Sequence, residues 1–286
     1  MTRTLRLAVP NKGRLESSTA TLLRDAGLVF EKTDRALSVN VSNVDLELLF
    51  VRADDIPEMI ADGVAELGIT GQDLLAEHGN GLIELAELGY GRCRLVAAVP
   101  RTVAAESAED FAGFRVATSH PNVTQRFFAE RDIDVTIVPL RGSVEVAPKL
   151  DVADAVVDLV STGSTLLVNG LNQVGTILES QAVLVAGPDA LRLRSTEVDQ
   201  VATALSAVVA GRGKRYLLLN APASAVEKMA EIIPGMESPT VVPLAEQGWV
   251  AVHSVVDADD VWNVLPDLKA LGGRDILVLR IQQLIA

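Results

Sequence analysis

The sequence is poor in the residues that build disulfide frameworks and metal sites. It contains one cysteine, Cys93, in 286 residues. A single thiol excludes a disulfide within the chain and disfavours a cysteine-based metal site. The three histidines, His78, His120 and His253, lack the close spacing of zinc ligands. We therefore expect no zinc site, and we expect Cys93 to be a small strand residue, because a catalytic thiol has no visible partner.

Aromatic residues and long apolar stretches are also scarce. Aromatics make up 3% of the chain and hydrophobic residues 49%, so the cores must be aliphatic. Aliphatic cores suit parallel α/β layers, whose strands are buried on both faces. No window reaches about 18 apolar residues without a charge, and no signal peptide is evident. The sequence predicts a cytoplasmic protein without a membrane partner.

Positive charge is in deficit. The formal net charge is -13, and such a surface repels a nucleic-acid backbone, so we expect no nucleic-acid partner. A small anion can bind only where a local pocket supplies cations and backbone N–H groups. The P-loop pattern and the G-x-G-x-x-G fingerprint are missing from the ends of the predicted strands. A Walker-type ATPase and a Rossmann dehydrogenase are therefore disfavoured.

Short apolar runs alternate with helix-period segments through most of the chain, which predicts an α/β fold with a parallel or mixed sheet in each of two lobes. We expect a first lobe over residues 1–100 and 182–211, with a second lobe, 101–181, inserted into it. Residues 214–286 have the order β-α-β-β-α-β of a ferredoxin-like domain.

A run of hydroxyl-bearing residues follows the predicted strand over residues 153–160. The run consists of Ser161, Thr162, Gly163, Ser164 and Thr165. Backbone N–H groups at a helix start, hydroxyls and a glycine together form a cradle for a phosphate dianion, assembled without a cation. Asp158 suits the hydroxyls of an adjoining sugar, so the segment indicates a 5-phosphorylated ribose. The same residues also fit an ordinary strand-to-helix turn.

Two further strand ends carry similar features. In residues 10–14, Lys12 and Arg14 flank a glycine at the start of a helix, an arrangement that suits a di- or triphosphate, although basic loop residues are commonly just solvated. Residues 68–74 again run from a strand through a glycine into a helix. Three such ends predict a phosphate-binding cleft between the lobes.

These segments together resemble one known enzyme family. The resemblance rests on "AVPNKGRL", "LGITGQDL", "TSHPN", "GSVEVAPKL" and "ADAVVDLVSTGSTL", and on the tail "PGMESPTVVPLAEQGWVAVHSVV". The chain is similar over essentially its whole length to the long form of ATP phosphoribosyltransferase, the first enzyme of histidine biosynthesis.

The resemblance implies a two-lobed, periplasmic-binding-protein-like catalytic region and a C-terminal ferredoxin-like βαββαβ regulatory domain. It implies a glycosyltransferase that joins N1 of the ATP adenine to C1 of 5-phosphoribosyl 1-pyrophosphate (PRPP) and releases pyrophosphate. Mg²⁺ would be carried by PRPP, with no metal held directly by the protein. L-Histidine would act as feedback inhibitor, and the chain would form a homo-oligomer, either a dimer or a hexamer.

The resemblance also assigns residues. The catalytic positions are Arg14, Glu145 and Asp158. The PRPP-binding positions are Lys12, Asp158, Ser161, Thr162, Gly163, Ser164 and Thr165. The nucleotide-binding positions are Gly71, Asp73, His120 and Pro121. His120 occupies a position where relatives carry tyrosine, so it is either a stacking residue or an ordinary loop residue.

For the histidine effector, the candidate residues are Asn220, Glu237, Ser238, Thr240 and Asp275. The two hydroxyls suit a carboxylate, and the other three side chains can accept hydrogen bonds from an ammonium group. The segment "ESPT" also fits a simple turn that contains proline.

No residue demands the role of a nucleophile, so the expected mechanism is positioning with electrostatic stabilisation. Two alternatives stay open. One is a two-lobed binding protein for a phosphorylated solute without catalysis. The other is a regulatory scaffold whose last domain senses an amino acid.

Overall fold

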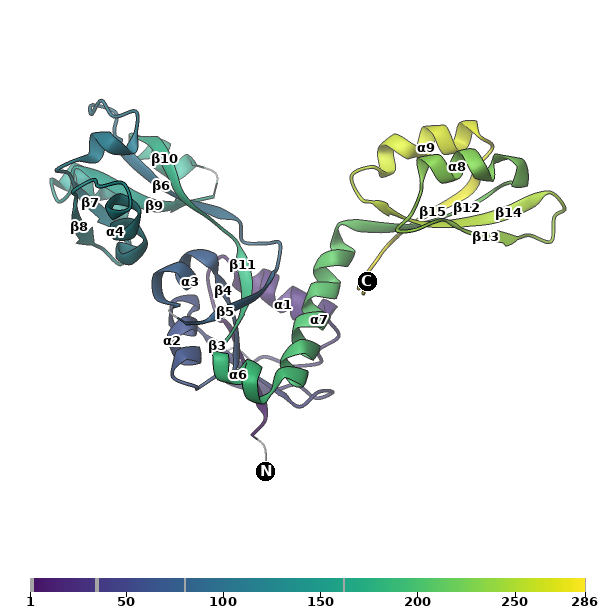
Figure 1. The fold of residues 1–286 in the computed structure, drawn as a ribbon, viewed down its shortest axis with the longest axis horizontal. Helices are drawn as coiled ribbons and strands as arrows, with labels where there is room; N and C mark the ends of the chain where they lie inside the picture. The colour runs from purple at the N-terminus through teal and green to yellow at the C-terminus, as the bar shows by residue number, and fades with distance from the viewer. Residues whose placement is uncertain (1–2, 34–35, 80, 162, 286) are drawn as a thin grey trace. The chain divides into compact units, whose positions relative to one another are not determined.

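The computed structural model describes residues 3–33, 36–79, 81–161 and 163–285, with Ser164 described by its backbone. The chain divides into two compact units (Figure 1). The first unit comprises Met1–Thr21 and Leu28–Ala202, and it holds both predicted catalytic lobes. The second unit comprises Leu22–Gly27 and Thr203–Ala286.

In the described residues, the first lobe is a six-stranded sheet in the order β2-β3-β1-β4-β11-β5. The strands are β2 (Ser38–Asn40), β3 (Leu46–Val51), β1 (Leu5–Pro10), β4 (Leu67–Gly71), β11 (Ala182–Ala186) and β5 (Ile83–Glu87). β1 pairs in parallel with β3 and β4, whereas β11 runs antiparallel to β4. All residues of β4 and β11 are buried, because apolar side chains leave both faces of each strand.

The described part of the second lobe is a five-stranded sheet in the order β10-β6-β9-β7-β8. The strands are β10 (Leu171–Ser180), β6 (Cys93–Pro100), β9 (Ala155–Val160), β7 (Arg115–Thr118) and β8 (Thr136–Pro139). Aliphatic and phenylalanine side chains fill one face of this sheet, and smaller aliphatic side chains fill the other.

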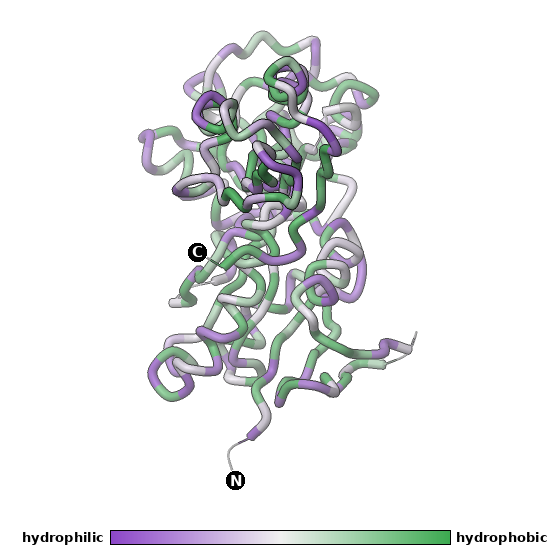
Figure 2. The backbone as a smooth tube through the Cα atoms, turned by 90° about the vertical axis from the view of Figure 1, so that its right-hand side faces the viewer, coloured by the Kyte–Doolittle hydropathy of each residue, from purple (hydrophilic) through white to green (hydrophobic). Residues whose placement is uncertain are grey.

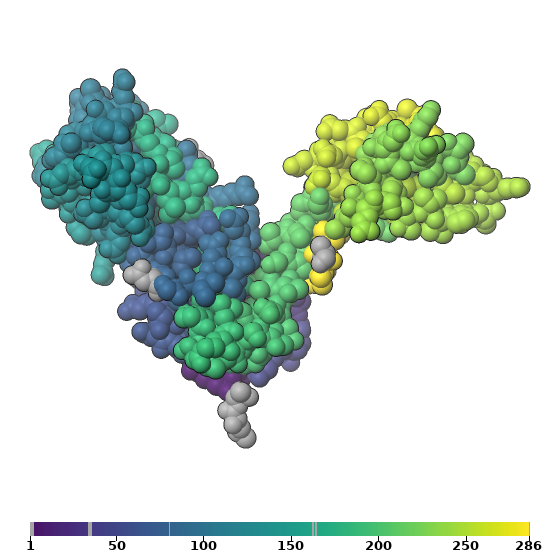
Figure 3. Space-filling model, in the orientation of Figure 1, coloured from purple at the N-terminus to yellow at the C-terminus, as the bar shows by residue number. Residues whose placement is uncertain are grey.

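The chain crosses between the lobes twice, from β5 to β6 and from β10 to β11. In the first sheet β2 and β11 run antiparallel to the other strands, and in the second sheet β6 does. Two mixed sheets joined by two crossings confirm the predicted two-lobed, periplasmic-binding-protein-like class. The predicted lobe boundary at residue 100 is wrong, because β6 pairs with β9 and β10 in the second sheet. In Figure 3 the side chains of the two lobes meet without a visible gap.

The helices of the first unit connect these strands. They are α1 (Glu16–Asp25), α2 (Ile56–Ala61), α3 (Gln72–His78), α4 (Pro121–Ala129), α5 (Ser164–Val168), α6 (Pro188–Leu193) and α7 (Ser195–Arg212); α1 and α7 extend into the second unit. Short 3-10 helices are η1 (Ala53–Asp55), η2 (Ala108–Phe111) and η3 (Val144–Leu150). α4 begins at Pro121, with His120 at the N-cap and the proline in the first turn.

The second unit has the predicted order β-α-β-β-α-β. Its described strands form an antiparallel sheet in the order β13-β14-β12-β15, with α8 and α9 on one face (Figure 1). The elements are β12 (Lys214–Pro222), η4 (Ala223–Ala225), α8 (Val226–Ile232), β13 (Thr240–Pro243), β14 (Trp249–Asp257), α9 (Val261–Ala270) and β15 (Arg274–Arg280). This confirms the ferredoxin-like prediction.

Apolar and hydrophilic stretches alternate along the backbone (Figure 2). Among the described residues, no helix combines the length and the apolarity that crossing a membrane requires.

Candidate active site

Four strand ends of the first unit carry the predicted site residues. Residues 10–14 follow β1, Gly71 ends β4, residues 118–121 follow β7, and residues 161–165 follow β9. The first two ends belong to the first lobe and the other two to the second. Because strand ends of an α/β sheet present side chains and free helix N–H groups, this is where a ligand is expected.

Asp73 and Arg14 connect two of these strand ends. The Arg14 guanidinium donates a hydrogen bond to Asp73 Oδ1 over 2.8 Å, and it also donates to the Gly91 carbonyl. Arg14 stands in the loop after β1, and Asp73 lies in the first turn of α3. The pair therefore fixes the loop to the neighbouring helix.

Gly71 makes room for this pair. A Cβ at Gly71 would collide with Asp73 Oδ1 and would lie 3.1 Å from the Arg14 guanidinium. A side chain at this position would displace the carboxylate. Gly71, which the sequence predicts to bind nucleotide, is therefore needed as glycine to leave space for the Asp73 carboxylate.

The Asp73 carboxylate is 1% exposed and has two further neighbours. Ser180, at the end of β10, donates to Asp73 Oδ1 over 2.5 Å, and His120 Nε2 lies 3.4 Å from Asp73 Oδ2. Burial raises the pKa of Asp73, but His120, Arg14 and Ser180 outweigh it and lower this pKa to about 2. Asp73 is therefore a fixed negative charge at neutral pH.

His120 is buried rather than displayed in a loop. It is 3% exposed, its Nδ1 lies 3.0 Å from Ser119 Oγ, and its backbone N–H donates to Thr118 Oγ1. Its Nε2 and Asp73 Oδ2 face each other without a regular hydrogen bond among the described residues. The ring contacts a carboxylate of the first lobe, which a free stacking residue would not do.

A second buried carboxylate, Glu77 of α3, joins the two lobes. Its two oxygens accept hydrogen bonds from the backbone N–H groups of Asn122 and Val123, each over 2.9 Å. Asn122 also donates through its side chain to the Glu77 carbonyl. Glu77 thereby satisfies free N–H groups at the start of α4 in the other lobe, and its charge suits the positive end of that helix.

A cavity of about 460 Å³ lies over these groups. The residues that line it include Lys12, Arg14, Arg52, Asp73, His78 and His120. Lys12, Arg14, Asp73 and His120 were predicted site residues, so the structure brings them together. An adjoining cavity of about 730 Å³ is lined by Pro121, Arg52 and Arg141, among others.

Asp158 and Glu145 form a separate acidic pair. Asp158 is half-buried in β9, and Glu145 belongs to η3, which packs beside that strand. Burial raises the pKa of Asp158, and Glu145 raises it further, whereas the Leu159 backbone N–H and His120 oppose the rise. The Leu159 N–H donates to Asp158 Oδ1 over 2.8 Å.

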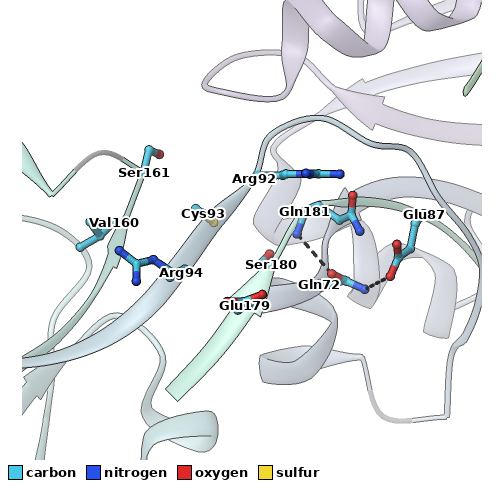
Figure 4. Close-up of a pocket in the computed structure, with 10 residues that line it drawn as sticks. All are labelled: Gln72, Glu87, Arg92, Cys93, Arg94, Val160, Ser161, Glu179, Ser180 and Gln181. Atoms are coloured by element: carbon cyan, nitrogen blue, oxygen red, sulfur yellow. Dashed lines mark hydrogen bonds between the residues drawn. The ribbon is translucent and has the colours of Figure 1, made fainter. Parts of the chain in front are cut away.

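The hydroxyl run after β9 begins at another cavity, of about 550 Å³, which Ser161 lines together with residues of the interlobe crossing strands (Figure 4). Gly163 has a φ of +82°, a conformation that glycine adopts freely, and α5 starts at Ser164. Thr165 is exposed. Thr162 lies outside the described residues.

Sequence reasoning missed Glu77, Ser180 and Arg52. Glu77 lies four residues after Asp73, so both carboxylates share one face of α3, and this spacing could have indicated it. Ser180 ends β10, a strand that the sequence did not predict. Arg52 follows β3, another strand of the parallel sheet.

Groups of three or more potential metal ligands are absent from the described residues. Asp158 and Glu145 are a pair of hard oxygen donors, which suits contact with an ion that arrives already coordinated by phosphates. Cys93 is buried, and burial raises the pKa of its thiol, so the neutral form predominates at neutral pH.

In the second unit, the structure brings two predicted effector residues together. Asn220 of β12 donates to Asp275 of β15 over 3.0 Å. Thr240 pairs with His253 of β14, and the strand alternation places its side chain on the same sheet face as Asn220. Glu237 and Ser238 are exposed in the segment before β13.

Comparison with known proteins extends over both units. Residues 52–207 match the family model described as ATP phosphoribosyltransferase, and residues 211–283 match that described as HisG, C-terminal domain. The chain is 47% identical to the ATP phosphoribosyltransferase of Gemmatimonas aurantiaca over 291 residues, covering 98% of this chain and 99% of that protein. It is 44% identical to that of Natronomonas pharaonis over 282 residues, covering 98% and 100%.

Among solved structures, the ATP phosphoribosyl transferase (HisG:HisZ) complex from Thermotoga maritima contains a similar chain. The TM-score is 0.64 and the identity 33%, over 72% of this chain and 98% of that chain. The family models, the relatives and this fold agree with each other. The chain belongs to the ATP phosphoribosyltransferase family.

Proposed function

We propose that this chain is an ATP phosphoribosyltransferase that joins N1 of the ATP adenine to C1 of PRPP and releases pyrophosphate. This reaction is the first step of L-histidine biosynthesis. The proposal rests on family membership over both units together with one structural observation. That observation is the cluster of Lys12, Arg14, Asp73 and His120 around a cavity of about 460 Å³ at facing strand ends.

The charges suit the expected transition state. Breaking the bond between C1 and pyrophosphate places positive charge on the ribose and negative charge on the leaving group. The cations Lys12 and Arg14 suit the leaving group, and Arg52 of the same cavity adds a third cation. Asp158 and Glu145 suit the ribose hydroxyls and the positive charge that develops at C1.

Arg14 combines this role with positioning. One side of its guanidinium is occupied by Asp73 and the Gly91 carbonyl, so its orientation is fixed before substrate arrives. A preorganised cation loses little reorganisation energy during the reaction. Asp73, Gly71, His120 and Pro121 then define the wall against which we place the nucleotide, with His120 as a buried support rather than an exposed stacking surface.

We place the 5-phosphate of PRPP in the run Ser161, Thr162, Gly163, Ser164 and Thr165, where backbone N–H groups and hydroxyls can donate to it. Mg²⁺ enters with PRPP, bound by its pyrophosphate, and supplies further charge neutralisation there. Asp158 and Glu145 are the residues that can contact the coordination shell of this ion.

We assign the second unit to feedback inhibition by L-histidine. Asn220, Asp275 and Thr240 share one face of its sheet, and Glu237 and Ser238 precede β13. Since the effector residues and the catalytic region lie on one chain, no separate regulatory subunit is needed. Exposed apolar residues on that sheet, such as Leu277 and Leu279, favour a homo-oligomer, a dimer or a hexamer. ATP and PRPP are cytoplasmic metabolites, so we place the protein in the cytoplasm.

The decisive experiment mixes pure protein with ATP, PRPP and Mg²⁺ and follows the absorbance of the adenine adduct together with pyrophosphate release. We expect both signals in equal amounts, and L-histidine should suppress both. Binding of PRPP without either signal would instead support the alternative, a two-lobed binding protein for a phosphorylated solute.

A further inference from the structure

The cavity of about 550 Å³ at the interlobe crossing contains basic residues that the assignment above does not use. Arg92, Arg94, Ser161, Glu87 and Glu179 line it (Figure 4). Ser161 is the first residue of the phosphate-binding run. A cavity that begins at this run and contains guanidinium groups is a candidate for part of the same substrate site.

Arg94 occupies a specific position beside that run. It lies in β6, directly opposite Val160 of β9 on one side and Glu179 of β10 on the other. Val160 is the residue immediately before Ser161. Since neighbouring strands lie about 4.8 Å apart, the register alone places Arg94 next to the end of β9, where the hydroxyl run starts.

The side chain of Arg94 turns toward β9 rather than toward its acidic neighbour. In Figure 4 it extends toward Val160, and no ion pair joins it to Glu179 although the two residues are direct cross-strand neighbours. Within the described residues, its guanidinium has no hydrogen-bonding or ionic partner. Arg94 is half-buried, so this charge is partly removed from water without a compensating anion.

Arg92 differs from Arg94 in direction. Figure 4 shows its side chain extending toward Gln181, away from Val160 and Ser161. The nearby Glu87 accepts a hydrogen bond from Gln72 over 3.4 Å. Arg94, rather than Arg92, therefore places its side chain at the end of the cavity next to Ser161.

We propose that Arg94 is a substrate-binding residue whose guanidinium pairs with the 5-phosphate of PRPP held by the run from Ser161 to Thr165. The inference rests on the proposed function, and it adds a cation to a cradle that the sequence suggested could work without one. Two N–H groups of a guanidinium match two phosphate oxygens, whereas a lysine offers only a point charge. The unpaired, half-buried charge would acquire its partner when substrate binds.

The test compares Arg94→Gln, Arg94→Lys and the control Arg192→Gln, an exposed arginine on α6. Steady-state kinetics give KM for PRPP and for ATP separately, and calorimetry with ribose 5-phosphate measures the phosphate subsite directly. We expect Arg94→Gln to raise KM for PRPP and Kd for ribose 5-phosphate about 10- to 100-fold, because a charge-assisted pair is lost. KM for ATP should change less than about threefold. Arg94→Lys should recover part of the loss, and the control should match wild type.

A structural role for Arg94 makes different predictions. If its charge serves Glu179, then Glu179→Gln should reproduce the effect of Arg94→Gln, and the melting temperature should fall in both variants. That result, or an unchanged Kd for ribose 5-phosphate in Arg94→Gln, would overturn the proposal. Failure of the proposed function can be distinguished from this result, because the wild-type protein would then yield no adduct. The ribose 5-phosphate titration does not depend on turnover, so it tests Arg94 in either case.

Discussion

The sheets of the two units differ in how many faces they bury. In the first unit, β4 and β11 are buried along their whole length, and β1 almost entirely. In the second unit, β12 alternates between buried and half-buried residues, while β13 is exposed throughout. A sheet covered on both faces leaves only strand ends for polar groups. The catalytic candidates accordingly gather at strand ends, and Asn220, Thr240 and Asp275 lie on or beside an open face.

This difference in burial predicts that truncating a leucine lowers the free energy of unfolding more in the first sheet than in the second. Leu184 of β11 is fully buried, and Leu279 of β15 is 49% exposed. Leu184→Ala should lower the free energy of unfolding of the first unit by about 2–5 kcal/mol, because it leaves a cavity. Leu279→Ala should change that of the second unit by about 0.5 kcal/mol or less. Urea titrations measure both, and equal losses would contradict the two-face description.

For a half-buried carboxylate within β9, we expect a large effect on activity with little effect on stability. Asp158→Asn keeps the size of the side chain but removes the charge proposed to stabilise the ribose. We expect kcat to fall about 100- to 1000-fold, the range found when one electrostatic stabiliser is removed. The melting temperature should stay within a few degrees. The matched control is Asp189→Asn on α6, and a wild-type rate in Asp158→Asn would falsify the assignment.

The buried carboxylate of Asp73 should make the stability of the first unit depend on pH. Its pKa falls from 3.8 in the unfolded chain to about 2 in the folded one, so the unfolded state binds the proton first as pH drops. The resulting stabilisation, about 2 kcal/mol, is fully present above about pH 4 and is lost as pH falls toward 2. Asp73→Asn lacks it. The stability difference between wild type and Asp73→Asn should therefore shrink between pH 4 and pH 2, and a constant difference would refute the folded-state pKa.

The smallest expected effect is on the affinity for L-histidine, at the open sheet face of the second unit. Asp275 is exposed and bonded to Asn220, so water competes for any ligand that it binds. Asp275→Ala should weaken L-histidine binding about 5- to 20-fold, which calorimetric titration measures. Asp259→Ala, another exposed aspartate of this unit, is the control. An unchanged affinity in Asp275→Ala would remove this residue from the effector site.

Much of the fold was predictable from the sequence, but the strand β10 was not. The strand β10 was missed because it is an edge strand with bulges and few buried residues, so it lacks a clear apolar alternation. In the site, Lys12, Arg14, Asp73 and His120 were named as candidates and line one cavity, whereas their mutual contacts were not predicted.

The sequence by itself determined the buried strands, the ferredoxin-like order of the last unit and the strand ends that carry hydroxyls and cations. These features depend on local apolar runs and on residues adjacent to them, so a short window contains the information. Tertiary structure alone decided that Asp73 meets Ser180, that Glu77 caps α4 in the other lobe and that Arg94 lies beside Val160. Those contacts join residues 45 to 107 positions apart, and only strand register and helix packing bring them within reach.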